Sequence, residues 1–232
     1  MSKSAPKEQN PWKSITWENT IADSDREVFN QLTQKQKDLI QIQLLPEPYW
    51  GNPDGDIVIL CGNPGYSGTD NCFVNNNQLL KLFTRVYSHQ ETRHVWFEGL
   101  IPAVTCPVSS QTIIHEGIKW WNSKIGWILK QRDVSLFVAE FFPYHSKKSA
   151  PFMKDHKQWN SSKYVDKIIE KAISRHKLII ILRWEKAWRN RFPCLEKYDK
   201  LIVVKNARAA SISEGNLQER DVETLKSYLK GT

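Results

Sequence analysis

The sequence predicts an α/β fold, a three-layer α/β/α sandwich around a short, mainly parallel sheet of four strands. Two observations predict it. Short runs rich in Ile, Val, Leu and Phe are typical of strands buried on both faces of a parallel sheet. Segments with apolar residues at helical spacing alternate with these runs, as in βαβ units. The four expected strands cover about 56–62, 134–142, 177–182 and 201–204.

The expected helices are placed by their caps and apolar spacing. Residues 1–22 are polar with scattered aromatics, and we expect a poorly ordered lead-in to one domain at 23–232. Ser24-Asp-Arg-Glu27 matches a capping box, so a first helix should run from about 25 to 43. Further helices are expected near 76–88, near 112–131, from Ser161 or Ser162, at 185–191, and after Asn216 as an N-cap.

Composition favours a soluble protein with an anionic partner. The chain has 232 residues, 40% of them hydrophobic, a net charge of +8 and a pI near 9.2. Nucleic acid, DNA in particular, is the first candidate partner, and a merely basic surface is the alternative. The sequence has no apolar run long enough for a membrane span and no secretory signal. We therefore expect a cytoplasmic or nucleoid-associated monomer that is not secreted.

The cysteines give no sign of a metal site. Cys61, Cys72, Cys106 and Cys194 form no C-x-x-C pair and no zinc spacing. We expect four free thiols, as is usual in the cytosol. No histidine cluster, P-loop or dinucleotide fingerprint is present, so we expect no metal and no cofactor.

Polar loops follow three of the expected strands, at 62–68, 143–148 and 205–213. In open α/β sheets, ligands bind beyond the carboxyl ends of the strands. The first loop, Gly62-Asn63-Pro64-Gly65-Tyr66-Ser67, resembles the first motif of the uracil-DNA glycosylase superfamily, and is most similar to the G-I-N-P-G-L-S of its mismatch-specific branch. The loop at 206–213, Asn-Ala-Arg-Ala-Ala-Ser-Ile-Ser, resembles the second motif of that branch, N-P-S-G-L-S.

The resemblance implies an enzyme that extrudes a base from DNA and cleaves its N-glycosidic bond without a metal. Asn63 matches the residue that positions the attacking water, and Gly65 would leave room for bulky bases. Phe73 matches an aromatic that stacks on the base. Each has a plainer interpretation: Asn63 and Gly65 as turn residues, and Phe73 as core. The residues expected at the base are Gly62, Pro64, Gly65, Tyr66, Phe73, Glu140 and Tyr144.

The same resemblance implies DNA contacts in the first and last loops. Ser67, Asn206, Arg208, Ser211 and Ser213 are the expected DNA-binding residues. Arg208 could reach a phosphate or fill the gap left by the base, and Ser211 and Ser213 could bind phosphates near the final helix. Local capping chemistry is the alternative for both serines. The branch motif has proline and serine where this chain has Ala207 and Arg208.

Two residues at the end of the second expected strand and in the loop after it carry further chemistry. Glu140 stands near the place where the superfamily often has an asparagine that reads uracil. As a carboxylate it would accept hydrogen bonds from an amino-bearing base edge, or pair with Lys147 or Lys148. His145 is a candidate catalytic donor or acid, with a local structural role as the alternative.

Three functions follow from these residues. The first is a DNA glycosylase that releases a deaminated or damaged base. The second is a non-catalytic nucleic-acid or nucleotide-binding member of the same fold. The third is a small-molecule hydrolase using His145 and Glu140. The sequence leaves open whether the protein is an enzyme.

Overall fold

A mixed five-stranded sheet forms the centre of the computed structural model, which describes residues 9–231 except 97–98, 107–109, 132–133 and 156. The strands are β1 (Tyr49–Gly51), β2 (Ile57–Leu60), β5 (Leu136–Ala139), β6 (Leu178–Ile181) and β7 (Leu201–Val203), in the order β1-β5-β2-β6-β7. The last four are mutually parallel, whereas β1 pairs antiparallel with β5. The predicted α/β class is confirmed, and the sheet has one strand more than expected.

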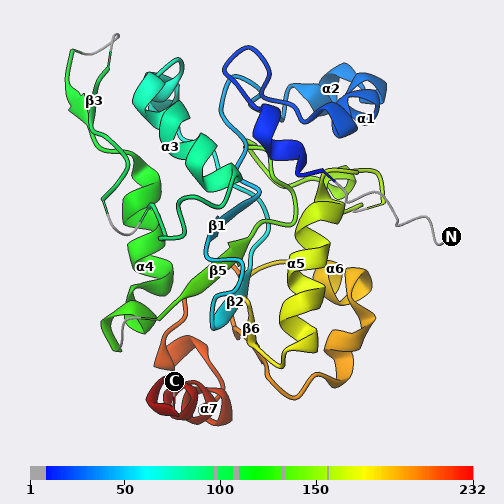
Figure 1. The fold of residues 1–232 in the computed structure, drawn as a ribbon, viewed down its shortest axis with the longest axis vertical. Coiled ribbons are helices and arrows are strands. Elements are labelled where there is room, and N and C mark those ends of the chain that lie inside the picture. The colour runs from blue at the N-terminus through cyan, green and yellow to red at the C-terminus, as the bar shows by residue number, and fades with distance from the viewer. Residues whose placement is uncertain (1–8, 97–98, 107–109, 132–133, 156, 232) are drawn as a thin grey trace, which may run out of the picture.

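Helices cover both faces of this sheet (Figure 1). Helices α3 and α4 lie on one side, and α5 and α6 lie on the other. The chain reaches this arrangement because β2 is central, so the connections to β5 and on to β6 run in opposite directions across the sheet. The main helices are α3 (Asn77–Tyr87), α4 (Glu116–Gln131), α5 (Ser162–Ser174), α6 (Glu185–Arg191) and α7 (Glu219–Gly231), with a short hairpin of β3 (Val104–Thr105) and β4 (Thr112–Ile113) before α4.

The predicted helix at 25–43 is wrong in its extent. Two short helices, α1 (Arg26–Gln31) and α2 (Gln34–Lys37), replace it, and the break falls at Thr33, which forms a capping box with Gln36. The expected capping box at Ser24 does not form. Asp25 occupies the N-cap of α1 without a capping hydrogen bond. Its buried carboxylate instead accepts hydrogen bonds from distant residues of the core.

The described part of the lead-in packs against the domain, which differs from the disorder expected for residues 1–22. A 3₁₀ helix at Pro11–Ser14 is capped by the Asn10 side chain, and Trp12 is completely buried. Asn10 also donates to the backbone oxygen of Tyr87 at the end of α3. Burial of an indole removes a large apolar surface from water, which holds this segment in place. Residues 1–8 lie outside the described ranges.

The expectation of four free thiols is wrong. A disulfide joins Cys72, in the 3₁₀ helix η3 (Gly68–Phe73), to Cys106, directly after β3. Cys61 and Cys194 are free. The two bonded residues are 34 positions apart, so no local spacing pattern signals the bond. None of the helices in the described part of the chain combines the length and apolar character that a membrane span requires.

Candidate functional site

A cleft of about 460 Å³ opens at the carboxyl ends of β2, β5 and β6. This is the point where the chain connections diverge from the central strand, and ligands of open α/β sheets bind there. The turn after β2 provides Asn63, Pro64, Gly65, Tyr66 and Ser67; the segments after β5 and β6 provide Glu140, His145 and Arg183. Helix α4 forms the opposite wall. The structure therefore brings seven of the predicted site residues into one cavity.

Asn63 is held with a defined orientation. Its amide nitrogen donates to the backbone oxygen of Pro64 and to Oγ of Ser146, each at 2.7 Å. Because a carbonyl oxygen can only accept, the nitrogen must face Pro64, which leaves Asn63 Oδ1 as the free acceptor. That oxygen can orient a water molecule or a ligand N–H, but it cannot take up a proton.

The two glycines of the turn have different roles. A side chain at Gly65 would meet no atom within 4 Å, so the cleft is open beside it. At Gly62, by contrast, a Cβ atom would lie 2.9 Å from the indole ring of Trp184. Gly62 does not line the cleft, so the expectation that it contacts the base is wrong. Its lack of a side chain lets Trp184 pack against the turn.

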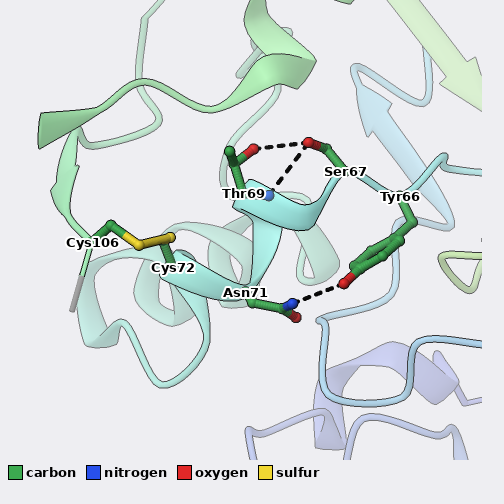
Figure 2. Close-up of a disulfide and its surroundings, with 6 residues drawn as sticks. All are labelled: Tyr66, Ser67, Thr69, Asn71, Cys72 and Cys106. Atoms are coloured by element: carbon green, nitrogen blue, oxygen red, sulfur yellow. Dashed lines mark hydrogen bonds between the residues drawn. A yellow bond between two sulfur atoms is a disulfide. The ribbon is translucent and has the colours of Figure 1, made fainter. Parts of the chain in front are cut away.

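The end of the turn is tied to helix η3 (Figure 2). Ser67 caps η3, with its hydroxyl 3.4 Å from the backbone nitrogen of Thr69. Asn71 donates to the hydroxyl of Tyr66 at 2.8 Å. The hydroxyl groups of Ser67 and Tyr66 therefore both form hydrogen bonds with residues of η3. The disulfide follows one residue later, so the wall of the cleft is covalently joined to the β3–β4 hairpin.

His145 is buried between Glu47 and the turn. Its Nε2 lies 3.0 Å from Glu47 Oε1, and its Nδ1 lies 2.7 Å from the backbone oxygen of Gly65. Burial alone would lower the pKa of His145, but the Glu47 charge and the hydrogen bonds to Glu47 and Gly65 raise it above its ordinary value. With a partner at each ring nitrogen, His145 holds the turn and has no ring nitrogen left for a substrate.

We expect the contribution of His145 to stability to fall as pH rises. A raised pKa in the folded state means that folding favours the protonated ring, so this contribution is complete below the unfolded pKa of about 6.5 and is lost as pH rises through the folded pKa. The difference in free energy of unfolding between wild type and His145→Gln should therefore shrink from pH 6 to pH 9. Urea titrations at each pH measure it, and a constant difference would contradict the assignment.

A second carboxylate–histidine contact lies nearby in the same cleft. His115 Nε2 is 3.4 Å from Asp70 Oδ1, and His115 Nδ1 accepts a hydrogen bond from the backbone nitrogen of Gly117. Burial lowers the pKa of His115 to about 4 and raises the pKa of Asp70. His115 is therefore neutral at pH 7, with its Nε2 proton directed at Asp70. The pair joins η3 to the start of α4.

Glu140 forms a buried wall of the cleft. Its side chain is 5% exposed, and Oε2 has no hydrogen-bond partner among the described residues. Burial, and then the charge of Glu47, raise the pKa of Glu140 well above its ordinary value. Burial thus favours the neutral acid, which both donates and accepts hydrogen bonds, over the carboxylate expected from the sequence. No ion pair with Lys147 or Lys148 forms in the described part of the chain.

The expectation that Phe73 and Tyr144 contact the base is wrong, because neither residue lines the cleft. Phe73 is 1% exposed and packs its ring against that of His115, at 4.6 Å between centroids. Tyr144 is 3% exposed, and its hydroxyl donates to Asp25 Oδ2 at 2.8 Å. Both aromatic side chains complete the core instead of facing a ligand.

The loop at 205–213 also lies outside the cleft lining, which corrects the expected convergence of three loops. It packs on α4: the backbone nitrogen of Ile212 donates to the backbone oxygen of Lys124, and Lys124 Nζ donates to that of Ala209. The expected DNA-binding residues of this loop are Asn206, Arg208, Ser211 and Ser213. Asn206 Oδ1 caps the loop's own turn, and the hydroxyls of Ser211 and Ser213 are 3.4 Å apart. Arg208 is exposed.

Several cleft residues were missed by the sequence interpretation, namely Glu47, Asp70, His115, Trp120 and Arg183. Arg183 had a usable signal, because it is a charged residue shortly after a buried strand. Glu47 lies between two prolines in a loop, where no periodic pattern exists. Asp70 and His115 meet only because the η3 and β4 segments fold together, and nothing in their spacing indicates this contact.

Comparisons of this chain with protein-family models, with curated proteins and with solved structures found no match. The described ranges contain no group of three or more His, Cys, Asp or Glu side chains that could hold a metal ion.

Proposed function

We propose that the cleft binds a nucleobase and that the protein is a DNA-glycosylase-like hydrolase. The observation that carries this proposal is the meeting of Asn63 and Glu140 in one cavity, large enough for a nucleobase, at the carboxyl edge of the sheet. The basic charge supports a nucleic-acid partner. Four parallel strands between two helical layers also fit the three-layer sandwich expected from the alternation of strands and helices, which a uracil-DNA-glycosylase-like fold would share.

The chemistry assigned to these residues is hydrolysis of the N-glycosidic bond. A base flipped out of DNA would enter beside Gly65, and Glu140 would hydrogen-bond its polar edge. Asn63 Oδ1 would orient a water whose oxygen bonds to C1′ as the C1′–N bond breaks. The base leaves with the bonding electrons, and the proton of the water passes to solvent. Without a group that takes this proton, the reaction should be slow.

A non-catalytic role is the second candidate, and a specific observation favours it. Both ring nitrogens of His145 are engaged, and Asn63 cannot act as a base. A pocket that only holds a base or nucleotide needs neither group. The same observation weighs against the small-molecule hydrolase, which requires a free nitrogen on His145. Both leading candidates predict that DNA affinity falls steeply with salt, because each contacts phosphates.

Base release from modified DNA separates the two candidates. Purified protein should release the base from oligonucleotides that contain uracil, hypoxanthine or xanthine. We expect Asn63→Ala to reduce the single-turnover rate by about 100-fold, the usual order for one positioned polar group at the reacting centre. Asn160 is an exposed asparagine just before α5, so the Asn160→Ala variant is the matched control and should keep the wild-type rate. Binding without release from any substrate would support the non-catalytic role.

A further inference from the structure

Two cations share one indole ring at the cleft. Trp120 of α4 lies with the guanidinium carbon of Arg183 5.4 Å from its ring centroid and with Lys124 Nζ 5.5 Å from it. Trp120 and Arg183 both line the cleft. Lys124 is one helical turn from Trp120, so α4 presents the ring and the ammonium on the same side. The site thus combines an aromatic surface with two positive charges from different parts of the chain.

Neither positive charge is in direct contact with a carboxylate among the described residues. No carboxylate there forms an ion pair with Arg183 or Lys124, and Arg183 Nε is buried without a hydrogen-bond partner. Burial, followed by the charge of Arg183, lowers the pKa of Lys124. Glu140 is near enough to Arg183 for the two groups to influence each other, but its Oε2 is buried without a hydrogen-bond partner and no described contact joins the two side chains. A buried donor without an acceptor is costly, and an anion would satisfy it.

We infer that Arg183, Lys124 and Trp120 form an anion-binding site for the phosphate of the nucleotide whose base occupies the cleft. A guanidinium binds phosphate oxygens with two parallel hydrogen bonds, and an ammonium adds a point charge. Lys124 Nζ donates once, to Ala209, so two of its protons remain for the ligand. The assignment of the anion to a nucleotide rests on the proposed function; the existence of the anion site does not.

Titration calorimetry with 2′-deoxyuridine, its 5′-monophosphate and inorganic phosphate tests this inference on the full chain. We expect the monophosphate to bind at least about tenfold more tightly than the nucleoside, the order expected of charge-assisted hydrogen bonds. Arg183→Gln and Lys124→Gln should each bring this ratio close to one. Lys81→Gln replaces an exposed lysine of α3 outside the cleft lining and should keep the wild-type ratio.

The outcomes separate the inference from the proposed function. A ratio near one in wild type, or a ratio unchanged in both variants, overturns the anion site while nucleoside binding still supports the base pocket. If neither nucleoside nor nucleotide binds, the base pocket fails. In that case inorganic phosphate binding that is lost in Arg183→Gln supports the anion site, and its absence overturns it. A uracil-containing trinucleotide that binds more tightly than the monophosphate would identify a strand phosphate, and equal binding a free nucleotide.

Discussion

Glu47→Ala should lower the free energy of unfolding by about 3–5 kcal/mol, the range for removing one partner of a buried ion pair. Glu47 is 5% exposed and is the acceptor for two buried donors, His145 Nε2 at 3.0 Å and Trp50 Nε1 at 3.1 Å. Truncation leaves both donors without an acceptor and withdraws the charge that raises the pKa of His145. The hydrogen bond from His145 to the carbonyl oxygen of Gly65 then loses the carboxylate that fixes the orientation of the ring.

A matched surface pair provides the control for this variant. Asp54 also accepts from two partners, Lys171 at 2.7 Å and Arg175 at 2.8 Å, but all three side chains are about half exposed. Asp54→Ala should therefore cost no more than about 1 kcal/mol. Urea unfolding at pH 6 compares the two variants directly. Equal losses for Glu47→Ala and Asp54→Ala would show that the buried pair has no special role.

The strands were predictable because burial on both faces leaves a continuous apolar pattern. Ile57–Leu60, Leu136–Ala139 and Leu178–Ile181 are entirely buried, and their composition alone indicates this. Strand β1 was missed because Tyr49–Gly51 is three residues long and directly follows a proline. A short edge strand is defined by its partner, here β5, and not by a pattern of its own.

Capping patterns were less reliable because tertiary contacts compete for the same polar groups. Ser24 and Glu27 have the right spacing for a capping box, but Asp25 between them is completely buried and accepts from Tyr144 and Ser161. These contacts fix the start of α1 from outside the helix. A local pattern of three or four residues cannot indicate a partner more than 100 positions away.

The candidate site was predictable where it depends on strand ends. Asn63, Glu140 and His145 follow parallel strands, and parallel strands bring their carboxyl ends to one edge of a sheet. The loop after β7 follows the same rule, yet it packs on α4 instead of the cleft. β7 is the edge strand, separated from β2 by β6, so its loop begins two strand positions from the central crevice.

The disulfide between Cys72 and Cys106 should contribute about 3–4 kcal/mol to stability. Its bond closes a loop with a sequence separation of 34, and cross-linking such a loop removes about this much conformational freedom from the unfolded chain. It also joins the two segments that bring Asp70 and His115 together, since Asp70 is in η3 and His115 follows β4, the partner strand of β3. Loss of the bond should therefore loosen this wall of the cleft.

The Cys72→Ser/Cys106→Ser double variant measures this contribution, with guanidinium unfolding as the assay. Reductant should destabilise the wild type by a similar amount and leave the double variant unchanged, because its remaining cysteines, Cys61 and Cys194, are both free. Cys61→Ala/Cys194→Ala is the matched control, and it should keep the full response to reductant. An identical response to reductant in wild type and the double variant would show that the two thiols are not joined, as the sequence interpretation expected. A loss of stability in reductant that the double variant does not show would instead establish the disulfide between Cys72 and Cys106.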